Sequence, residues 1–452
     1  MTYFFETYGC QMNNAESAAL VLVCREHGWT PASDGNTADL VLINTCSVRQ
    51  TAEQRVLGRI ALYVSIKKKR LARKENFALV IAGCMAQRLG ENLKERFPQI
   101  DYIIGTSSRS LFPLILDIVE KNLNTNSPVF PEITPEEKPV FAFSPLHLEE
   151  GQFRSFVPIM HGCDNFCSFC IVPYVRGNEV SRDPKMIAEE IRIVGERGVK
   201  EITLLGQNVN SYDWQKGEMN FAGLLRLVAS EAEKNGIKWV RFLSANPKDF
   251  SQETIQVMAE NPVFCRHLHL CVQHGSNRIL EAMNRGYTRE RYISLVKEIR
   301  SAMPGISLST DIMAGFPGEE KEDIKQTLEL MEEVKFLYAY MYHYNPREGT
   351  AAYNLPDKIS EKVKKDRLSK IINLQFKHTS SLLKERIGVR TTVLIEGISR
   401  KNADELITRT ERDEMVVVPG KASMIGSFAE LTLSGLRGNT FRSKEFRLCP
   451  GD

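Results

Sequence analysis

The stretch Cys163-Asp-Asn-Phe-Cys167-Ser-Phe-Cys170 places three cysteines directly after the apolar run Phe156–Met160. The apolar run predicts a strand, and the loop after a parallel strand opens at the carboxyl face of a barrel, where active sites are built. Three thiolates on a four-iron cluster leave one iron open to chelation by the amino and carboxylate groups of a small molecule. We therefore expect a catalytic iron–sulfur centre on Cys163, Cys167 and Cys170.

A zinc site is the alternative interpretation of this motif. Structural zinc takes four Cys or His ligands, usually from two closely spaced pairs. The sequence offers no second pair that matches the first. An open iron–sulfur cluster is therefore favoured.

Repeated strand and helix patterns surround the cysteine motif. Strands are predicted at Phe156–Met160, Glu201–Leu205, Trp239–Leu243, Leu268–Val272, Ser307–Met313 and Phe336–Tyr342, and helices at Pro184–Glu196, Phe221–Glu233, Arg289–Ala302 and Glu320–Val334. Right-handed crossovers wind such units into a parallel barrel. Six units predict an α/β fold with a central partial (β/α)6 barrel over residues 149–380.

The segment 1–118 predicts a separate parallel α/β domain. Its strands, Tyr3–Thr7, Asp39–Asn44 and Ala78–Ala82, are followed by Cys10, Cys46 and Cys84, in that order. Loops beyond the carboxyl ends of parallel strands gather at one edge of the sheet. We therefore expect these three cysteines to converge on one point.

A linker is predicted at residues 119–148, which are rich in Pro, Asn and Glu without a clear period. After the barrel, a polar helix is predicted at Ser360–Arg386, and short strands at Thr391–Glu396, Met415–Val418 and Ser427–Leu433. Short alternating strands with turn signals fit a small β-barrel. This C-terminal barrel is expected over residues 381–450.

The composition is that of a globular chain of 452 residues, with 42% hydrophobic and 25% charged residues. No apolar run approaches the roughly 20 residues of a membrane span. The N-terminus lacks a secretory signal pattern, so we expect a cytoplasmic protein without a membrane segment.

The chain has ten cysteines. Because the cytoplasm keeps thiols reduced, we expect these cysteines to be metal ligands or free thiols rather than disulfides. A net charge of +3 permits a nucleic-acid partner without requiring one.

The cysteine motif resembles that of the radical S-adenosylmethionine (SAM) superfamily, and the stretch from Gly162 to Arg182 resembles its methylthiotransferase branch, most closely the MiaB type. The phrases Thr7-Tyr-Gly-Cys-Gln-Met-Asn13, Asn44-Thr-Cys-Ser-Val-Arg49 and Gly83-Cys-Met-Ala-Gln87 are similar to the three N-terminal cysteine motifs of that branch. The segment from Gly388 to Phe446 resembles its RNA-binding TRAM barrel.

This resemblance implies two [4Fe-4S] clusters, one on Cys163, Cys167 and Cys170 that cleaves SAM, and an auxiliary one on Cys10, Cys46 and Cys84. It implies addition of a methylthio group to C2 of N6-isopentenyladenosine at position 37, next to the tRNA anticodon, with two SAM molecules. The implied partners are the tRNA anticodon stem-loop, a sulfur donor, and an electron donor such as flavodoxin or ferredoxin.

SAM contacts are expected at five residues. The resemblance implies that Phe169 contacts the adenine and that Gly206 and Gln207 lie near the methionine amino group. Gln273 and Asp311 end the fourth and fifth barrel strands, so they are expected in the barrel mouth. Each of these two is equally well explained as a polar residue satisfied inside the core.

The sequence departs from the resemblance at three positions of the expected SAM pocket. Cys271, His274 and Asn246 stand where the family usually has Pro, Ser and His, whereas Cys24, Cys265, Cys271 and Cys449 match no ligand motif and are predicted to be structural. The basic run Lys67–Lys74 is either a solvated helix face or a phosphate contact.

Two alternatives to this function remain at this stage. A sister methylthiotransferase would act on threonylcarbamoyl-adenosine of tRNA or on a ribosomal protein. A non-catalytic, metal-containing RNA-binding protein is the alternative of another class. The open three-cysteine motif argues against it, because a purely structural site is normally closed.

Overall fold

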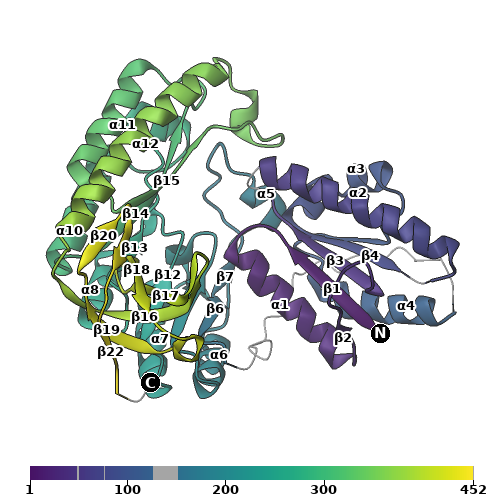
Figure 1. The fold of residues 1–452 in the computed structure, drawn as a ribbon. Coiled ribbons are helices and arrows are strands. Elements are labelled where there is room, and N and C mark those ends of the chain that lie inside the picture. The colour runs from purple at the N-terminus through teal and green to yellow at the C-terminus, as the bar shows by residue number, and fades with distance from the viewer. Residues whose placement is uncertain (48–49, 76, 126–150, 451–452) are drawn as a thin grey trace.

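The computed structural model describes residues 1–47, 50–75, 77–125 and 151–450, which form three parts (Figure 1). The N-terminal part stands beside the central partial barrel, and the C-terminal sheet packs against the start of the barrel strands. Among the residues that the structure describes, every helix is too short or too polar to cross a lipid bilayer.

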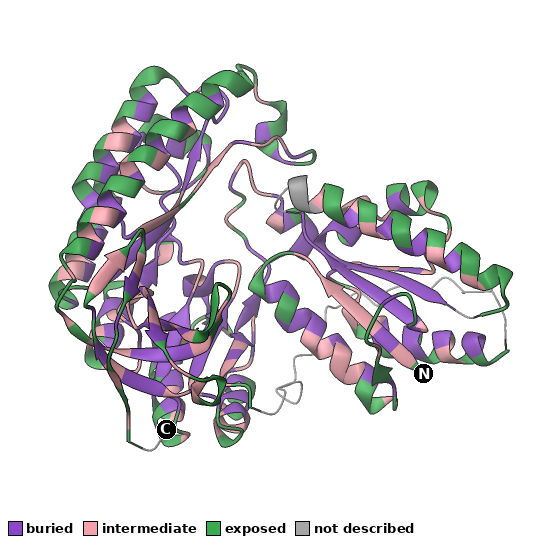
Figure 2. Cartoon of the chain, in the orientation of Figure 1, coloured by how far each residue is buried: buried purple, intermediate pink, exposed green. Residues whose placement is uncertain are grey.

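The N-terminal part is a parallel five-stranded sheet in the order β2-β1-β3-β4-β5, as predicted. Its strands are β1 (Thr2–Thr7), β2 (Thr30–Pro31), β3 (Leu40–Thr45), β4 (Ala78–Gly83) and β5 (Tyr102–Ile104), and its helices are α1 (Gln11–Glu26), α2 (Gln50–Ala72), α3 (Cys84–Arg96) and α4 (Phe112–Thr125). Helices α1 and α4 pack on one face and α2 and α3 on the other. The central strands β3 and β4 are therefore buried on both faces (Figure 2).

Two short strands, β2 and β5, were not predicted, because two or three residues carry no readable period. Helix α4 continues to Thr125, so the helix extends past the predicted boundary at residue 118 and into the predicted linker. The remainder of that linker lies outside the described residues.

The central part contains the six predicted strands, all parallel and in sequence order around the partial barrel. They are β6 (Arg154–Pro158), β9 (Glu201–Leu205), β12 (Trp239–Phe242), β13 (His267–His269), β14 (Ser307–Ala314) and β15 (Tyr338–His343). Two three-stranded sheets, β6-β9-β12 and β13-β14-β15, are joined by the single bridges Val240–Phe264 and Ala245–Leu270.

Helices connect these strands and cover the barrel's outside (Figure 1). They are α6 (Pro184–Glu196), α7 (Phe221–Lys234), α8 (Gln252–Glu260), α9 (Asn277–Ala282), α10 (Arg289–Ala302) and α11 (Lys321–Val334), with the short elements α5 (Val172–Arg176), β7 (Met160–His161), β8 (Val180–Ser181), β10 (Asp213–Trp214) and β11 (Met219–Asn220) in the loops. Helices α8 and α9 were missed by the sequence analysis.

The fourth predicted strand, Leu268–Val272, is shorter in the structure, where β13 ends at His269. Beyond His269, the backbone forms hydrogen bonds first to β14 and then to the segment after β12. Leu270 N–H donates to Ser309 O, and Cys271 N–H donates to Ala245 O. Leu268, Leu270 and Val272 still pack outward into the core beneath the helices. The residues between them therefore face the barrel's interior.

The C-terminal part is a seven-stranded mixed sheet that follows α12 (Glu361–Lys384) and encloses its own apolar core. Its strands are β16 (Arg390–Ser399), β17 (Asn402–Thr410), β18 (Met415–Pro419), β19 (Phe428–Thr432), β20 (Gly435–Arg437), β21 (Thr440–Arg442) and β22 (Phe446–Leu448). Three of these strands were predicted. The predicted boundary between residues 380 and 381 falls inside α12.

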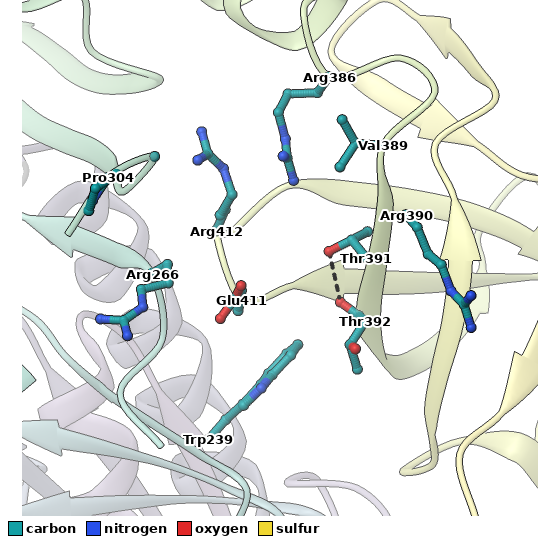
Figure 3. Close-up of a pocket in the computed structure, with 11 residues that line it drawn as sticks. Trp239, Arg266, Pro304, Arg386, Val389, Arg390, Thr391, Thr392, Glu411 and Arg412 are labelled. Carbon is teal, nitrogen blue, oxygen red and sulfur yellow. Dashed lines mark hydrogen bonds between the residues drawn. The ribbon is translucent and has the colours of Figure 1, made fainter. Parts of the chain in front are cut away.

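The C-terminal sheet contacts the start of the barrel strands, away from the cysteine loop. Arg241 of β12 donates to the carbonyls of Thr410 and Glu411, each at 3.0 Å. The rings of Trp239 and Phe428 meet edge to face with centroids 4.8 Å apart. A cavity of about 500 Å³ opens at this junction. Its lining includes four arginines, Arg266, Arg386, Arg390 and Arg412 (Figure 3).

Candidate active site

Cys163, Cys167 and Cys170 lie in the loop between β7 and α5, at the carboxyl end of the barrel. The three sulfurs are close enough to influence one another's ionisation. Burial raises the pKa of Cys163 to about 11 and that of Cys170 to about 12. Since a metal binds the thiolate, assembly of a centre here must release these protons.

Hydrogen bonds connect the cysteine loop to segments on the opposite side of the barrel. Ser168 N–H donates to Met283 O at 3.0 Å, and Ser168 O accepts from Ala352 N–H at 2.7 Å. Buried Arg285 donates from Nη1 to Cys167 Sγ at 3.1 Å and from Nη2 to Cys271 O at 3.0 Å. The sequence analysis missed Arg285, because a single arginine far along the chain carries no motif signal.

The expected SAM contacts surround this loop. Phe169 is half-buried and packs against an apolar cluster that includes Met313 and Phe316. Gly206 lies against Met160, where an added Cβ would come within 2.5 Å of the Met160 side chain. The neighbouring Gln207 has a buried Oε1 without a hydrogen-bond partner among the described residues. This unsatisfied acceptor fits a site that receives an amino group.

Gln273 and Asp311 are brought together in the barrel mouth. Gln273 N–H donates to Asp311 O at 2.9 Å, and Gln273 Oε1 accepts from Tyr342 OH at 2.6 Å. Gln273 adopts a left-handed φ of 67°. Gln273 is buried and its amide oxygen is satisfied by Tyr342, which corresponds to the alternative of a core polar residue, and contact of either side chain with SAM stays a prediction.

The second cysteine triad lies at one edge of the N-terminal sheet. Thr7 pairs with Asn44 and Thr45 pairs with Gly83, so the strands that precede the cysteines end side by side. Gly9 has a φ of 131°, and a side chain there would come within 2.6 Å of Cys46 Cβ. Burial raises the pKa of Cys84, and the neighbouring Cys10 thiol acts in the same direction.

Asn13 holds the loops of this triad together. Its amide Nδ2 donates to Thr45 O at 2.9 Å, and its Oδ1 accepts from Cys10 Sγ at 3.2 Å. Cys46 and Cys84 are buried, whereas Cys10 is exposed. Three soft sulfur ligands at the ends of adjacent strands fit an iron–sulfur cluster.

The two cysteine loops face each other across the junction of the two parts. Cys84 belongs to one small apolar cluster with Ile171 and Val175, and Ile171 directly follows Cys170. Thr106 Oγ1 donates to Val175 O across the same junction. Convergence of the N-terminal triad, predicted from the strand ends, is thus accompanied by a contact between the two loops that the sequence did not reveal.

A buried ion pair fixes this junction. Arg176 Nη1 donates to Glu16 Oε1 at 2.6 Å, and Arg109 Nη1 lies 2.5 Å from the same oxygen. Burial alone would raise the pKa of Glu16, but the two guanidinium groups lower it to about 2. Glu16 is therefore a carboxylate at neutral pH.

The basic run Lys67–Lys74 and the cysteines outside the two triads have mixed surroundings in the structure. Lys67 is buried and binds Asp101, so neither interpretation of the basic run, a solvated helix face or a phosphate contact, holds for this residue. Lys68, Lys69, Arg73 and Lys74 are exposed. Cys24 and Cys265 pack in apolar clusters, whereas Cys271 is buried beside a polar partner, with its Sγ 3.2 Å from His269 Nε2.

Comparison with known proteins agrees with this geometry. Residues 157–331 match the radical SAM superfamily, residues 384–442 match the TRAM domain, and residues 2–105 match the uncharacterized protein family UPF0004. The chain is 49% identical to the tRNA-2-methylthio-N(6)-dimethylallyladenosine synthase of Treponema denticola, covering 98% of this chain and 99% of the relative. It belongs to this family of synthases.

Other relatives support the same assignment. The synthase of Geobacter sulfurreducens is 41% identical, over 95% of this chain and 94% of that protein. Among solved structures, the radical SAM methyltransferase TsrM from Kitasatospora setae matches with a TM-score of 0.58 at 14% identity, covering 78% of this chain and 74% of that one. That likeness concerns the fold alone. The synthase family makes this chain a radical SAM methylthiotransferase, an enzyme that uses SAM and [4Fe-4S] clusters.

Proposed function

We propose that this synthase adds a methylthio group to C2 of N6-isopentenyladenosine at position 37 of tRNA. The observation that carries the proposal is the contact between the two cysteine loops, where Cys84 shares an apolar cluster with the residue after Cys170. A reaction that joins sulfur to a carbon activated by SAM chemistry needs both centres within reach of one substrate. The names of the relatives support the choice of tRNA base.

We assign the SAM-cleaving cluster to Cys163, Cys167 and Cys170 and the auxiliary cluster to Cys10, Cys46 and Cys84. When bound, the first cluster supplies the electron for reductive cleavage of SAM. The chain's own residues then hold the substrate: Gln207 offers its free acceptor, and Phe169, Gln273 and Asp311 line the mouth. Arg285 donates to Cys167 and so withdraws charge from one ligand sulfur.

The C-terminal sheet is proposed to bind tRNA. The arginine-lined cavity at its base supports this role, because guanidinium groups pair with phosphate oxygens. An electron donor such as flavodoxin or ferredoxin and a separate sulfur donor complete the proposed set of partners, and a cytoplasmic location is proposed with them. The proposed order of domains is kept, although helices α4 and α12 cross the predicted limits at residues 118 and 380.

The decisive experiment is nucleoside analysis of tRNA after anaerobic reaction with the reconstituted enzyme, SAM and a reductant. The expected product is the 2-methylthio derivative of isopentenyladenosine, and the enzyme should contain about eight irons, as two four-iron clusters require. Product on threonylcarbamoyl-adenosine, or on a ribosomal protein offered in parallel, would replace the proposed substrate. Zinc without sulfide in either triad would contradict the radical chemistry.

A further inference from the structure

Three side chains outside both cysteine triads meet inside the barrel mouth. His269 and Cys271 come from the end of β13 and the residues beyond it, and Asp311 comes from β14. One ligand atom from each lies within 4.8 Å of the other two. Cys271 Sγ is 3.2 Å from His269 Nε2, and His269 Nε2 is 3.7 Å from Asp311 Oδ2.

These separations match the edges of a tetrahedral metal site. Zinc binds nitrogen and oxygen at about 2.0 Å and sulfur at about 2.3 Å, so adjacent tetrahedral ligands lie roughly 3.3–3.5 Å apart. The two measured edges fall on either side of this range. A small inward movement of Asp311, whose side chain is 26% exposed, would complete the set.

The hydrogen bonding around His269 suits a ligand histidine. Its Nδ1 lies 2.9 Å from Ser309 Oγ, and His267 Nε2 lies 2.9 Å from the same oxygen. If Ser309 donates its single proton to His267, it accepts from His269 Nδ1–H, which leaves the lone pair of Nε2 facing Cys271 and Asp311. Metal-binding histidines are commonly fixed in this way by a partner on the other ring nitrogen.

The charge and burial also fit a divalent cation. A thiolate and a carboxylate together balance two positive charges, and His269 and Cys271 are 7% and 9% exposed. The nearby cation Arg285 has its donors directed to Cys167 Sγ and the carbonyl of Cys271, so it does not occupy the site. The partly exposed side of Asp311 leaves room for a fourth ligand.

We propose that His269, Cys271 and Asp311 form a third metal site, for a zinc-like divalent cation, distinct from the two iron–sulfur centres. The mixed nitrogen, sulfur and oxygen donors favour zinc over a hard cation such as magnesium. The site has three protein ligands and one open position, which faces the barrel mouth.

The test uses the holoenzyme with both clusters assembled, so that their cysteines are occupied. Zinc affinity is measured by competition with a chromogenic chelator, and bound metal is counted by elemental analysis. Wild-type enzyme should take up one zinc per chain in addition to its iron. Cys271→Ser should bind at least about 100-fold more weakly, because a ligand change costs more than the 10–100-fold typical of outer partners. Asp311→Asn should weaken binding in the same direction.

Cys449→Ser is the matched control, since Cys449 lies in the C-terminal part and should leave zinc uptake unchanged. X-ray absorption at the zinc edge provides a readout independent of activity, with one sulfur at about 2.3 Å and the other ligands nitrogen or oxygen. Failure of the wild-type enzyme to bind zinc, equal affinity in Cys271→Ser, or a shell of several sulfurs from a cluster triad would each overturn the proposal.

Discussion

Arg176 donates a hydrogen bond of 2.6 Å from Nη1 to Oε1 of Glu16, and so joins α5 of the barrel to α1 of the N-terminal part. Both side chains are almost completely buried, at 3% and 0% exposure. Asn13, which orders the loops of the auxiliary triad, also contacts Arg176, through its Oδ1 at 3.4 Å. The pair thus connects the docking of the two parts with the geometry of the N-terminal cysteines.

Replacing Glu16 should loosen this junction. Glu16→Gln leaves Arg176 and Arg109 without their carboxylate, and removal of one partner from a buried pair costs about 3–5 kcal/mol in the free energy of unfolding. Urea unfolding, followed by tryptophan fluorescence, measures this loss. Glu189→Gln, which disrupts an exposed pair with Arg192, should leave the midpoint unchanged. Equal midpoints for both variants would mean that the buried pair contributes nothing to docking.

The same pair gives stability a pH dependence. The pKa of Glu16 falls from an ordinary 4.5 to about 2 in the folded chain. A lowered carboxyl pKa stabilises the fold fully above the unfolded value, so the contribution is present above about pH 4.5 and is lost as the pH falls toward 2. Urea midpoints of the cluster-free protein between pH 6 and pH 3 should therefore decrease more in the wild type than in Glu16→Gln. Parallel pH profiles would contradict this assignment.

The two cysteine triads should fail differently when substituted. Alanine at Cys163, Cys167 and Cys170 removes the proposed SAM-cleaving cluster and should abolish 5′-deoxyadenosine formation. Alanine at Cys10, Cys46 and Cys84 should spare that cleavage but stop methylthiolation of tRNA. Both products are measured by liquid chromatography and mass spectrometry. The division of roles is falsified if the second variant, folded and holding one cluster, makes no 5′-deoxyadenosine.

Arg285 should tune the potential of the SAM-cleaving cluster. Its charged donor to Cys167 stabilises the more negative, reduced state, and such a bond is worth about 1.5–3 kcal/mol. Arg285→Met should therefore lower the cluster's reduction potential by about 65–130 mV, since 59 mV corresponds to a tenfold change for one electron. Potentiometry followed by electron paramagnetic resonance measures this shift. Arg278→Met, at an exposed position of α9, is the control, and an equal shift in that variant would remove the specific role of Arg285.

The cavity at the base of the C-terminal sheet should bind phosphate groups of the tRNA. Arg412→Gln is expected to weaken tRNA binding and to reduce the slope of log affinity against log salt by about 0.9 for each phosphate that the variant no longer neutralises. Filter binding at several salt concentrations measures both quantities. Arg226→Gln, on the outer helix α7, should change neither. If Arg412→Gln keeps the wild-type slope, the exposed lysines and arginines near Lys68 are the next candidates.

Local patterns predicted much of the fold and the grouping of Cys10, Cys46 and Cys84 at one sheet edge. Strand periodicity indicated the ends of β1, β3 and β4, and parallel topology then placed Cys10, Cys46 and Cys84 at one edge. Contacts between distant residues carry no such pattern. Arg285 reaches Cys167 from 118 residues away.

The surroundings of Cys271 inside the barrel also could not be predicted from the sequence. Cys271 was predicted to be structural because an isolated cysteine usually fills a core. Its actual partners, His269 and Asp311, depend on the register of β13 against β14 and on the break in β13 after His269. Lys67 likewise looked like part of a solvated basic face, whereas helix packing turns it inward to Asp101.

The pair of Glu16 and Arg176 also has a consequence for biosynthesis. The two residues are 160 positions apart in the chain. At synthesis rates of about 5–20 residues per second, Arg176 is made roughly 8 to 32 s after Glu16. During that interval the N-terminal sheet can form, but its carboxylate lacks the cation from the barrel. The nascent N-terminal part therefore acquires its final packing only after α5 has been made. A pause in translation within the barrel would prolong the time during which the surface around Glu16 can bind wrong partners.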